Sequence, residues 1–175
     1  MGTLTSREAL ALRWAELCND PSLRDLPYKI ELNAFGNIEM TPASNRHARL
    51  QAKIAQELAR LLPGGDTLTE SAIATDIGVR VPDVVWASTA FLAKHGDSTP
   101  FPEAPEICVE IRSPSNAPEE MELKKRAYLA AGAVEVWVVT EDGDLSIFDA
   151  EGPREESRFG VTLTLPPRAA RNGDH

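Results

Sequence analysis

Apolar residues recur along this chain at two spacings, one typical of helices and one typical of strands. A period of three to four residues predicts three helices, over residues 6–18, 47–62 and 116–131. The third helix has Asn116 as its predicted N-cap, with Glu119 three residues later as the partner of a capping box. The second helix has the clearest apolar stripe, formed by Leu50, Ile54, Leu58, Leu61 and Leu62.

Shorter runs of alternating or β-branched residues predict strands between these helices. They cover residues 28–32, 38–40, 67–70, 73–75, 79–86, 106–112, 134–140 and 145–148. The segment 87–105 is expected to be mostly loop, with a helical turn around residues 90–94. The strand, helix and strand over residues 106–140 form a crossover unit, which predicts a parallel strand pair. We therefore expect an α/β fold with a mixed central β-sheet flanked by helices.

Length and charge limit the class of protein and its partners. At 175 residues the chain is expected to form one domain. The sequence shows no apolar run long enough to span a membrane and no secretory signal. These two observations predict a cytoplasmic location. The formal net charge of -9 argues against a protein that coats nucleic acid through many phosphate contacts. It does not exclude a nuclease, because a bound metal ion neutralises carboxylates locally.

Two carboxylates interrupt strongly apolar strands. Asp83 lies in the run of residues 81–86, and Glu110 lies in the run of residues 108–112. Burying a carboxylate is costly unless it is paired with a cation or holds a metal ion. If the two strands are neighbours, Asp83 and Glu110 converge on one cation, and their oxygen ligands favour Mg²⁺ or Mn²⁺. The alternative is structural, with one carboxylate at the surface, where its strand ends, and the other paired with Arg112.

A lysine on the third predicted helix is a candidate partner for these carboxylates. Lys124 lies on the same side of that helix as Met121 and Tyr128, which are expected to pack inward. Two carboxylates and a lysine are the minimum set for metal-assisted phosphodiester hydrolysis. The alternative is a solvated lysine that pairs with Glu120 across one helical turn. Its neighbour Lys125 is expected to face solvent.

Three further polar residues have ordinary structural interpretations when each is taken alone. Glu31 is interpreted as a solvent-facing residue of the first strand. His47 opens the second helix, where a single histidine is usually a capping or surface residue. Asn45, or Ser44 before it, is the expected N-cap of that helix.

Taken together and in order, these segments resemble the Uma-two family, a group of proposed restriction endonucleases in the PD-(D/E)XK nuclease superfamily. The resemblance is strongest over residues 80–86, 109–116, 124–128 and 132–139, with a similar upstream block over residues 28–32, 36–42 and 44–47. It implies a restriction-endonuclease-like core over residues 28–165. An N-terminal helical extension over residues 1–27 would precede this core, and a flexible tail over residues 166–175 would follow it.

The resemblance also implies roles for individual residues. Asp83 and Glu110 would be the metal ligands, with Mg²⁺ or Mn²⁺ as the cofactor. Lys124 would be the catalytic lysine, carried by the helix and not by the strand. Glu31 would be an auxiliary acidic residue near the metal. The resemblance therefore implies four catalytic residues, Asp83, Glu110, Glu31 and Lys124.

The resemblance also implies residues that bind the substrate. One position among them departs from the superfamily pattern. His47 and Asn45 would lie at the edge of the cleft. The simple motif has a lysine two residues after the glutamate, but this chain has Arg112 there. Arginine stays protonated and cannot act as a general base, although it can bind a phosphate bidentately. Either Lys124 supplies the missing ammonium or the site is catalytically weak.

The sequence thus leaves three functional hypotheses. The first is a Mg²⁺- or Mn²⁺-dependent endonuclease with DNA as its substrate. The second is a catalytically inactive module on the same fold that binds nucleic acid or protein, because a fold does not determine a function. The third is a hydrolase of another phosphate ester. A homodimer is expected under the first hypothesis, because cleavage of both DNA strands commonly needs two active sites.

Overall fold

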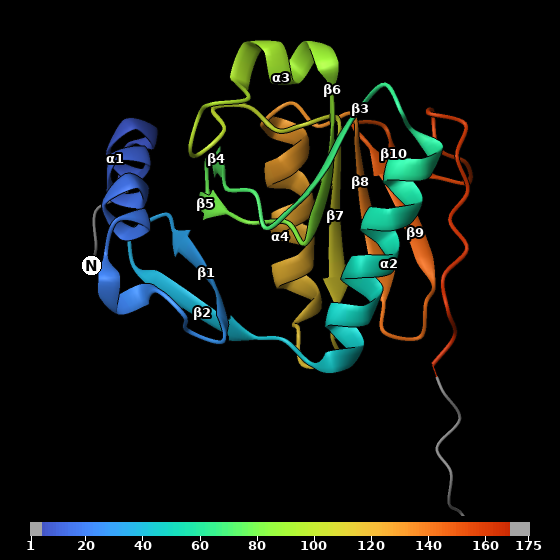
Figure 1. Ribbon diagram of the computed structural model, residues 1–175, viewed down its shortest axis with the longest axis horizontal. Coiled ribbons are helices and arrows are strands. Elements are labelled where there is room, and N and C mark those ends of the chain that lie inside the picture. Colours follow the sequence, from blue (N-terminus) through green and yellow to red (C-terminus); the bar gives the residue numbers. More distant parts are fainter. Residues whose placement is uncertain (1–4, 169–175) are drawn as a thin grey trace, which may run out of the picture.

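Two β-sheets and four α-helices form the part of the chain that the computed structural model describes, residues 5–168 (Figure 1). The helices are α1 (Arg7–Cys18), α2 (Asn45–Leu61), α3 (Thr89–His95) and α4 (Pro118–Ala130), and a short 3-10 helix spans Pro21–Leu23. The strands are β1 (Tyr28–Asn33), β2 (Ile38–Pro42), β3 (Gly65–Thr69), β4 (Ile73–Thr75), β5 (Gly78–Arg80), β6 (Val84–Ser88), β7 (Ile107–Arg112), β8 (Glu135–Thr140), β9 (Leu145–Asp149) and β10 (Gly152–Arg154).

The smaller sheet has four strands in the order β2-β1-β5-β4, and its paired strands are antiparallel. The predicted hairpin at the start of the chain is confirmed, since β1 and β2 pair from Tyr28 opposite Pro42 to Leu32 opposite Ile38. Helix α1 packs against this sheet, and Leu10, its most buried residue, lies in one apolar core with Leu32 (Figure 1). The N-terminal helix and the hairpin therefore share a core of their own.

The larger sheet has six strands in the order β10-β9-β8-β7-β6-β3. Strands β7 and β8 are parallel, with Glu110 opposite Val138, and α4 connects them. The other pairs in this sheet are antiparallel. The predicted crossover unit and the predicted mixed sheet are therefore both confirmed.

The six-stranded sheet separates two apolar cores, because successive side chains of a strand point to opposite faces. One face is covered by α2 and by the segment 159–165, and its buried strand residues include Val84, Trp86, Ile107 and Val109. The other face is covered by α4, and its buried apolar strand residues include Val85, Cys108 and Val136. In Figure 1 the sheet is seen between α2 and α4. Glu110 falls on the α4 face, which determines its neighbours.

The prediction of one strand over residues 79–86 is wrong, because the chain changes sheets within it. Strand β5 ends at Arg80 in the smaller sheet, and β6 begins at Val84 in the larger sheet. Pro82 lies in the break, and proline has no backbone N–H for a strand ladder. The break leaves Asp83 at the junction of the two sheets.

The predicted start of α4 is also wrong. The N-cap is Ala117 and makes no side-chain capping bond, while the Asn116 Oδ1 accepts a hydrogen bond from the Ser113 backbone N–H at 2.9 Å. Pro118 is the first helical residue, and the residue before a proline favours extended backbone, as Ala117 shows with φ -66 and ψ 139. Glu119 therefore has no capping-box partner at Asn116.

Two elements extend beyond what the sequence predicts. Helix α3 has seven residues where one helical turn is expected, and β10 has no predicted counterpart. Within residues 5–168, no helix is both long and apolar enough to cross a membrane. Residues 169–175 of the predicted tail lie outside the described part of the chain. The predicted domain boundaries and cellular location stay predictions.

Candidate active site

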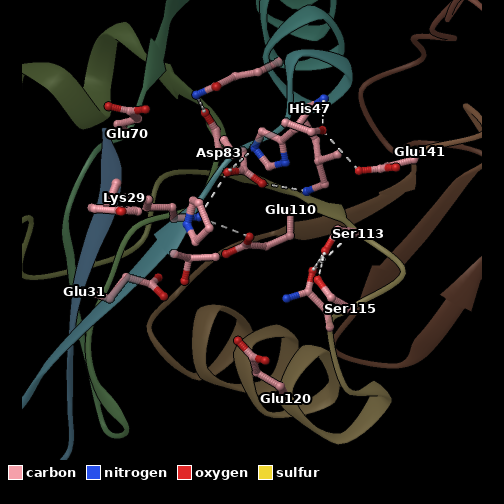
Figure 2. Close-up of a pocket in the computed structure, with 18 of the residues that line it drawn as sticks. Lys29, Glu31, His47, Glu70, Asp83, Glu110, Ser113, Ser115, Glu120 and Glu141 are labelled. Carbon is pink, nitrogen blue, oxygen red and sulfur yellow. Dashed lines mark hydrogen bonds and ion pairs between the residues drawn. The ribbon is translucent and has the colours of Figure 1, made fainter. Parts of the chain in front are cut away.

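A cavity of about 780 Å³ lies where the two sheets meet. Its walls come from the β1–β2 hairpin, the start of α2, the end of β7 and one side of α4. Figure 2 shows Asp83 and Glu110 near the middle of this space, with Glu70, Glu120 and Glu141 further out. The cavity thus brings together segments that lie far apart in the sequence.

The two oxygens of Asp83 have different partners. Its Oδ2 accepts a hydrogen bond from the Ile111 backbone N–H at 2.7 Å, which connects the sheet junction to β7. Its Oδ1 lies 3.0 Å from the Lys29 Nζ and 3.0 Å from the His47 Nε2. Burial raises the pKa of Asp83, but the Lys29 ammonium and the His47 hydrogen bond outweigh it and hold the pKa well below its usual range. Asp83 is therefore a buried anion.

Glu110 has weaker partners for its charge. The Tyr128 hydroxyl donates to its Oε1 at 2.6 Å, while the ammonium groups of Lys29 and Lys124 lie 3.5 and 3.6 Å from its oxygens. Burial raises the pKa of Glu110, and the two lysines offset this only in part. Among residues 5–168, Asp83 accepts from a backbone N–H and has a cation within 3.0 Å, whereas Glu110 has neither. This difference explains why the two pKa values move in opposite directions.

A third carboxylate joins the cluster from β1. The Glu31 Oε2 lies 2.9 Å from the Lys124 Nζ, and its Oε1 accepts from the Val81 backbone N–H at 2.8 Å. The Arg80 guanidinium lies 3.6 Å from the same carboxylate. Burial raises the pKa of Glu31, but Lys124, nearby cations and the backbone bond lower it further than burial raises it. The structure thus excludes the interpretation of Glu31 as a solvent-facing residue.

Lys29 contacts both central carboxylates at once. Its side chain is 15% exposed, and its Nζ bridges the Asp83 Oδ1 and the Glu110 Oε2. Burial lowers the pKa of Lys29, but the charges of Glu110 and Asp83 raise it well above the usual range of a lysine. The ammonium is therefore protonated at neutral pH.

The structure brings five of the seven predicted site residues into this cavity, namely Asp83, Glu110, Lys124, Glu31 and His47. Lys124 is buried against Glu31 and Glu110, so the alternative pairing with Glu120 is not the one observed. The neighbouring Lys125 is only 17% exposed and lies over the Phe148 ring at 4.0 Å, so its predicted solvent-facing position is wrong.

Two predicted residues do not line the cavity in the part of the chain that the structure describes. Arg112 is the last residue of β7, opposite Thr140 of β8. The charged partners of Glu110 are Lys29 and Lys124, so the pairing with Arg112 that the structural alternative gave is not the one observed. Asn45 is the exposed first residue of α2. Ser44 precedes it as the N-cap and accepts from the His47 backbone N–H at 3.0 Å.

Lys29 and Tyr128 contact the carboxylates and Gln51 contacts the backbone of Asp83, yet the sequence analysis assigned none of the three to the site. The Gln51 Nε2 donates to the Asp83 backbone carbonyl at 2.9 Å. Two of the three have a usable signal in the sequence. Lys29 is two residues before Glu31 on one strand, and Tyr128 is four residues after Lys124 on one helix, so each shares a face with a predicted site residue.

The chemistry of the donor set fits a hard divalent cation, because Asp83 and Glu110 offer carboxylate oxygens that point at a common position. In this structure those oxygens are paired with Lys29. Among residues 5–168, no group of three or more His, Cys, Asp or Glu side chains is arranged to hold a metal ion. A metal at this site would therefore need water or substrate oxygens, and it would have to replace the lysine contacts.

A mixed sheet with helices on both faces, carrying buried carboxylates and lysines at one end, has the features that the nuclease resemblance predicts. The family model Uma2, described as "Putative restriction endonuclease", matches residues 16–170. The chain therefore belongs to the Uma2 family.

A structural comparison agrees with this assignment. The fold is similar to a crystal structure described as "a putative nuclease belonging to DUF820" from Anabaena variabilis ATCC 29413, with a TM-score of 0.57 and 15% sequence identity. The similarity covers 75% of this chain and 83% of that chain. At this identity the likeness establishes the fold. A search of curated proteins finds no match.

Proposed function

We propose that the protein is a divalent-metal-dependent endonuclease that hydrolyses DNA phosphodiester bonds. The observation that carries the proposal is that three side chains meet in one cavity: Asp83, just before β6, Glu110 of the neighbouring strand β7, and Lys124 of the crossover helix α4. Family membership supports nuclease chemistry, and the carboxylate pair supports metal dependence.

In this proposal Asp83 and Glu110 hold Mg²⁺ or Mn²⁺. When bound, such an ion polarises the scissile phosphate and activates a water. Lys124 stabilises the negative charge that develops on the phosphate, and its contact with Glu31 at 2.9 Å keeps its ammonium at the cavity wall. Tyr128 orients Glu110 through its hydroxyl, and His47 orients Asp83. Cleavage of both strands would use two copies of the chain.

Plasmid nicking by the wild type and by Asp83→Asn in Mg²⁺, Mn²⁺ or EDTA tests the proposal. We expect metal-dependent nicking by the wild type and a loss of at least about 100-fold in the variant, a size typical for loss of one essential catalytic group. Glu155→Gln removes an exposed carboxylate outside the cavity and is the control, with nicking unchanged. Circular dichroism checks that each variant is folded.

One observation favours the alternative of a non-catalytic binding module. The three carboxylates of the cluster already have three cationic partners within the protein, Lys29, Lys124 and Arg80. Folded wild-type protein that cuts neither supercoiled nor branched DNA in any of these metals, yet binds DNA, would establish the module. Cleavage of RNA or small phosphodiesters alone would instead support a different phosphate ester as substrate.

A further inference from the structure

The Lys29 ammonium already holds the position of a counter-cation between the two proposed metal ligands. Its Nζ lies 3.0 Å from the Asp83 Oδ1 and 3.5 Å from the Glu110 Oε2. These are the oxygens that face each other across the cavity, because the Asp83 Oδ2 bonds to the Ile111 N–H and the Glu110 Oε1 accepts from Tyr128. A divalent cation that binds both carboxylates therefore needs the same two oxygens as Lys29.

The charges of the cluster lead to the same conclusion. Glu31, Asp83 and Glu110 carry three negative charges when ionised, and the two ammonium groups of Lys29 and Lys124 contact them. Arg80 contacts Glu31 but also pairs with Glu39, and His47 contacts Asp83. A divalent ion added beside both ammonium groups would leave a buried excess of positive charge around the three carboxylates, which is unfavourable away from water. Departure of one ammonium relieves part of that excess.

Lys29 is better placed to leave than Lys124. The Lys29 side chain is 15% exposed, lines the open cavity and ends a flexible four-carbon stem on a strand of the hairpin. The Lys124 side chain is 8% exposed and is fixed by Glu31 at 2.9 Å. The hairpin side of the cavity therefore offers the movable cation, and the helix side offers the fixed one.

We propose that Lys29 is a resident counter-cation of the Asp83–Glu110 pair, and that a divalent metal ion binds by displacing its ammonium into the cavity. This inference rests on the proposed function, because it takes Asp83 and Glu110 as the metal ligands. In the absence of metal, Lys29 keeps two buried carboxylates paired and so limits their mutual repulsion. The same contact weakens metal binding, since the metal must first break it.

Calorimetric titration of metal-free protein with Mn²⁺ tests the competition directly. We expect Lys29→Gln to bind Mn²⁺ at least about tenfold more tightly than the wild type, a difference of about 1.4 kcal/mol. Adding Asp83→Asn to that variant should remove the gain. Lys94→Gln changes an exposed lysine that pairs with Glu103 and is the matched control, with wild-type affinity. Equal or weaker Mn²⁺ binding by folded Lys29→Gln overturns the inference.

A second measurement uses the unaltered protein, so it does not depend on the variant folding. Lysine acetylation followed by mass spectrometry should show Lys29 protected in EDTA and increasingly modified as Mn²⁺ is added, because the displaced amine becomes accessible. Modification of the exposed Lys94 should not change. Protection of Lys29 that persists at Mn²⁺ concentrations that saturate the calorimetric isotherm overturns the inference.

These outcomes separate the inference from the nuclease proposal. Tighter Mn²⁺ binding by Lys29→Gln, with no cleavage by any form of the protein, leaves the counter-cation role intact and refutes the nuclease. If the wild type binds Mn²⁺ tightly and cleaves DNA, and Lys29→Gln does not change the Mn²⁺ affinity, only the counter-cation role is refuted. If no form binds Mn²⁺, both proposals fail.

Discussion

Single residues in this protein show that burial alone does not determine the state of a carboxylate. Asp83 and Glu110 are both almost fully buried, yet the pKa of Asp83 is lowered and that of Glu110 is raised. The difference follows from hydrogen-bond donors, since Asp83 has a backbone N–H and close cation contacts, whereas both cations near Glu110 are more distant. The roles of the two residues should therefore differ, with Asp83 the more permanent anion.

Another buried carboxylate, Glu135, lies outside the cavity and has a structural role. Its Oε2 accepts from the Trp137 Nε1 at 2.8 Å and from the Ser157 Oγ at 2.8 Å, and its Oε1 accepts from the Arg158 backbone N–H at 2.6 Å. These bonds attach the segment after β10 to the start of β8. Because each partner is a donor in these bonds, only an acceptor group can replace the carboxylate without loss.

We predict that Glu135→Gln lowers the free energy of unfolding by about 1–3 kcal/mol, because the amide NH₂ places a donor against buried donors. Urea denaturation followed by circular dichroism measures the change. Glu155→Gln alters an exposed glutamate of the same segment and should stay within about 0.5 kcal/mol of the wild type. Equal stability of the two variants would show that the Glu135 bonds add nothing to folding.

At the scale of elements, the short strand β5 decides where the site forms. It pairs with both β1 and β4 in the smaller sheet, and the chain then crosses to β6 of the larger sheet within three residues. Gly78 begins β5 with φ +122, and a Cβ there would lie 2.0 Å from the Leu32 carbonyl oxygen of β1. This close approach of two backbones needs glycine.

We predict that Gly78→Ala destabilises the protein by about 1–3 kcal/mol, through the positive φ and the backbone clash. Differential scanning calorimetry should show a lower Tm. Gly64→Ala is the control, because a Cβ at Gly64 would meet nothing within 4 Å, and its Tm should be close to that of the wild type. An unchanged Tm for Gly78→Ala would contradict the assigned packing of β5 on β1.

At the scale of the whole molecule, charge opposes the proposed substrate. The formal net charge is -9, and six acidic residues line the cavity beside Lys29 and Lys124. Three of them, Glu70, Glu120 and Glu141, lie in the outer part of the cavity (Figure 2) and would repel DNA phosphates unless a cation intervenes. Under the proposed function, a divalent metal ion is therefore needed for substrate binding as well as for chemistry.

We predict that Ca²⁺ raises the affinity of the wild type for a DNA duplex roughly tenfold over that in EDTA, about 1.4 kcal/mol. The physical reason is that a hard, oxygen-binding cation held by Asp83 and Glu110 adds positive charge at the position where DNA phosphates would bind. Fluorescence anisotropy at constant ionic strength measures the change, and Asp83→Asn/Glu110→Gln should show no Ca²⁺ effect. Equal DNA affinity in Ca²⁺ and in EDTA would show that DNA binding does not depend on a metal ion at Asp83 and Glu110.

Sequence patterns predict most of the elements because those patterns report burial. The apolar stripe of α2 and the run around Glu110 each reflect one face that must leave water. The prediction failed at 79–86, where Pro82 lies between two short strands of similar composition. It also failed at Asn116, where Pro118 moved the start of the helix. In both places a local backbone restriction overrode the side-chain pattern.

The sequence by itself determined that the runs around Asp83 and Glu110 belong to a core, because apolar residues surround both carboxylates, and it favoured their burial. It did not determine which cations would meet them. Lys29 is 54 residues from Asp83 and 81 from Glu110, and Lys124 is 93 from Glu31. Those meetings depend on how the hairpin sheet is placed against the six-stranded sheet. Only the tertiary structure decides this, because long-range packing has no local spacing that a sequence pattern can record.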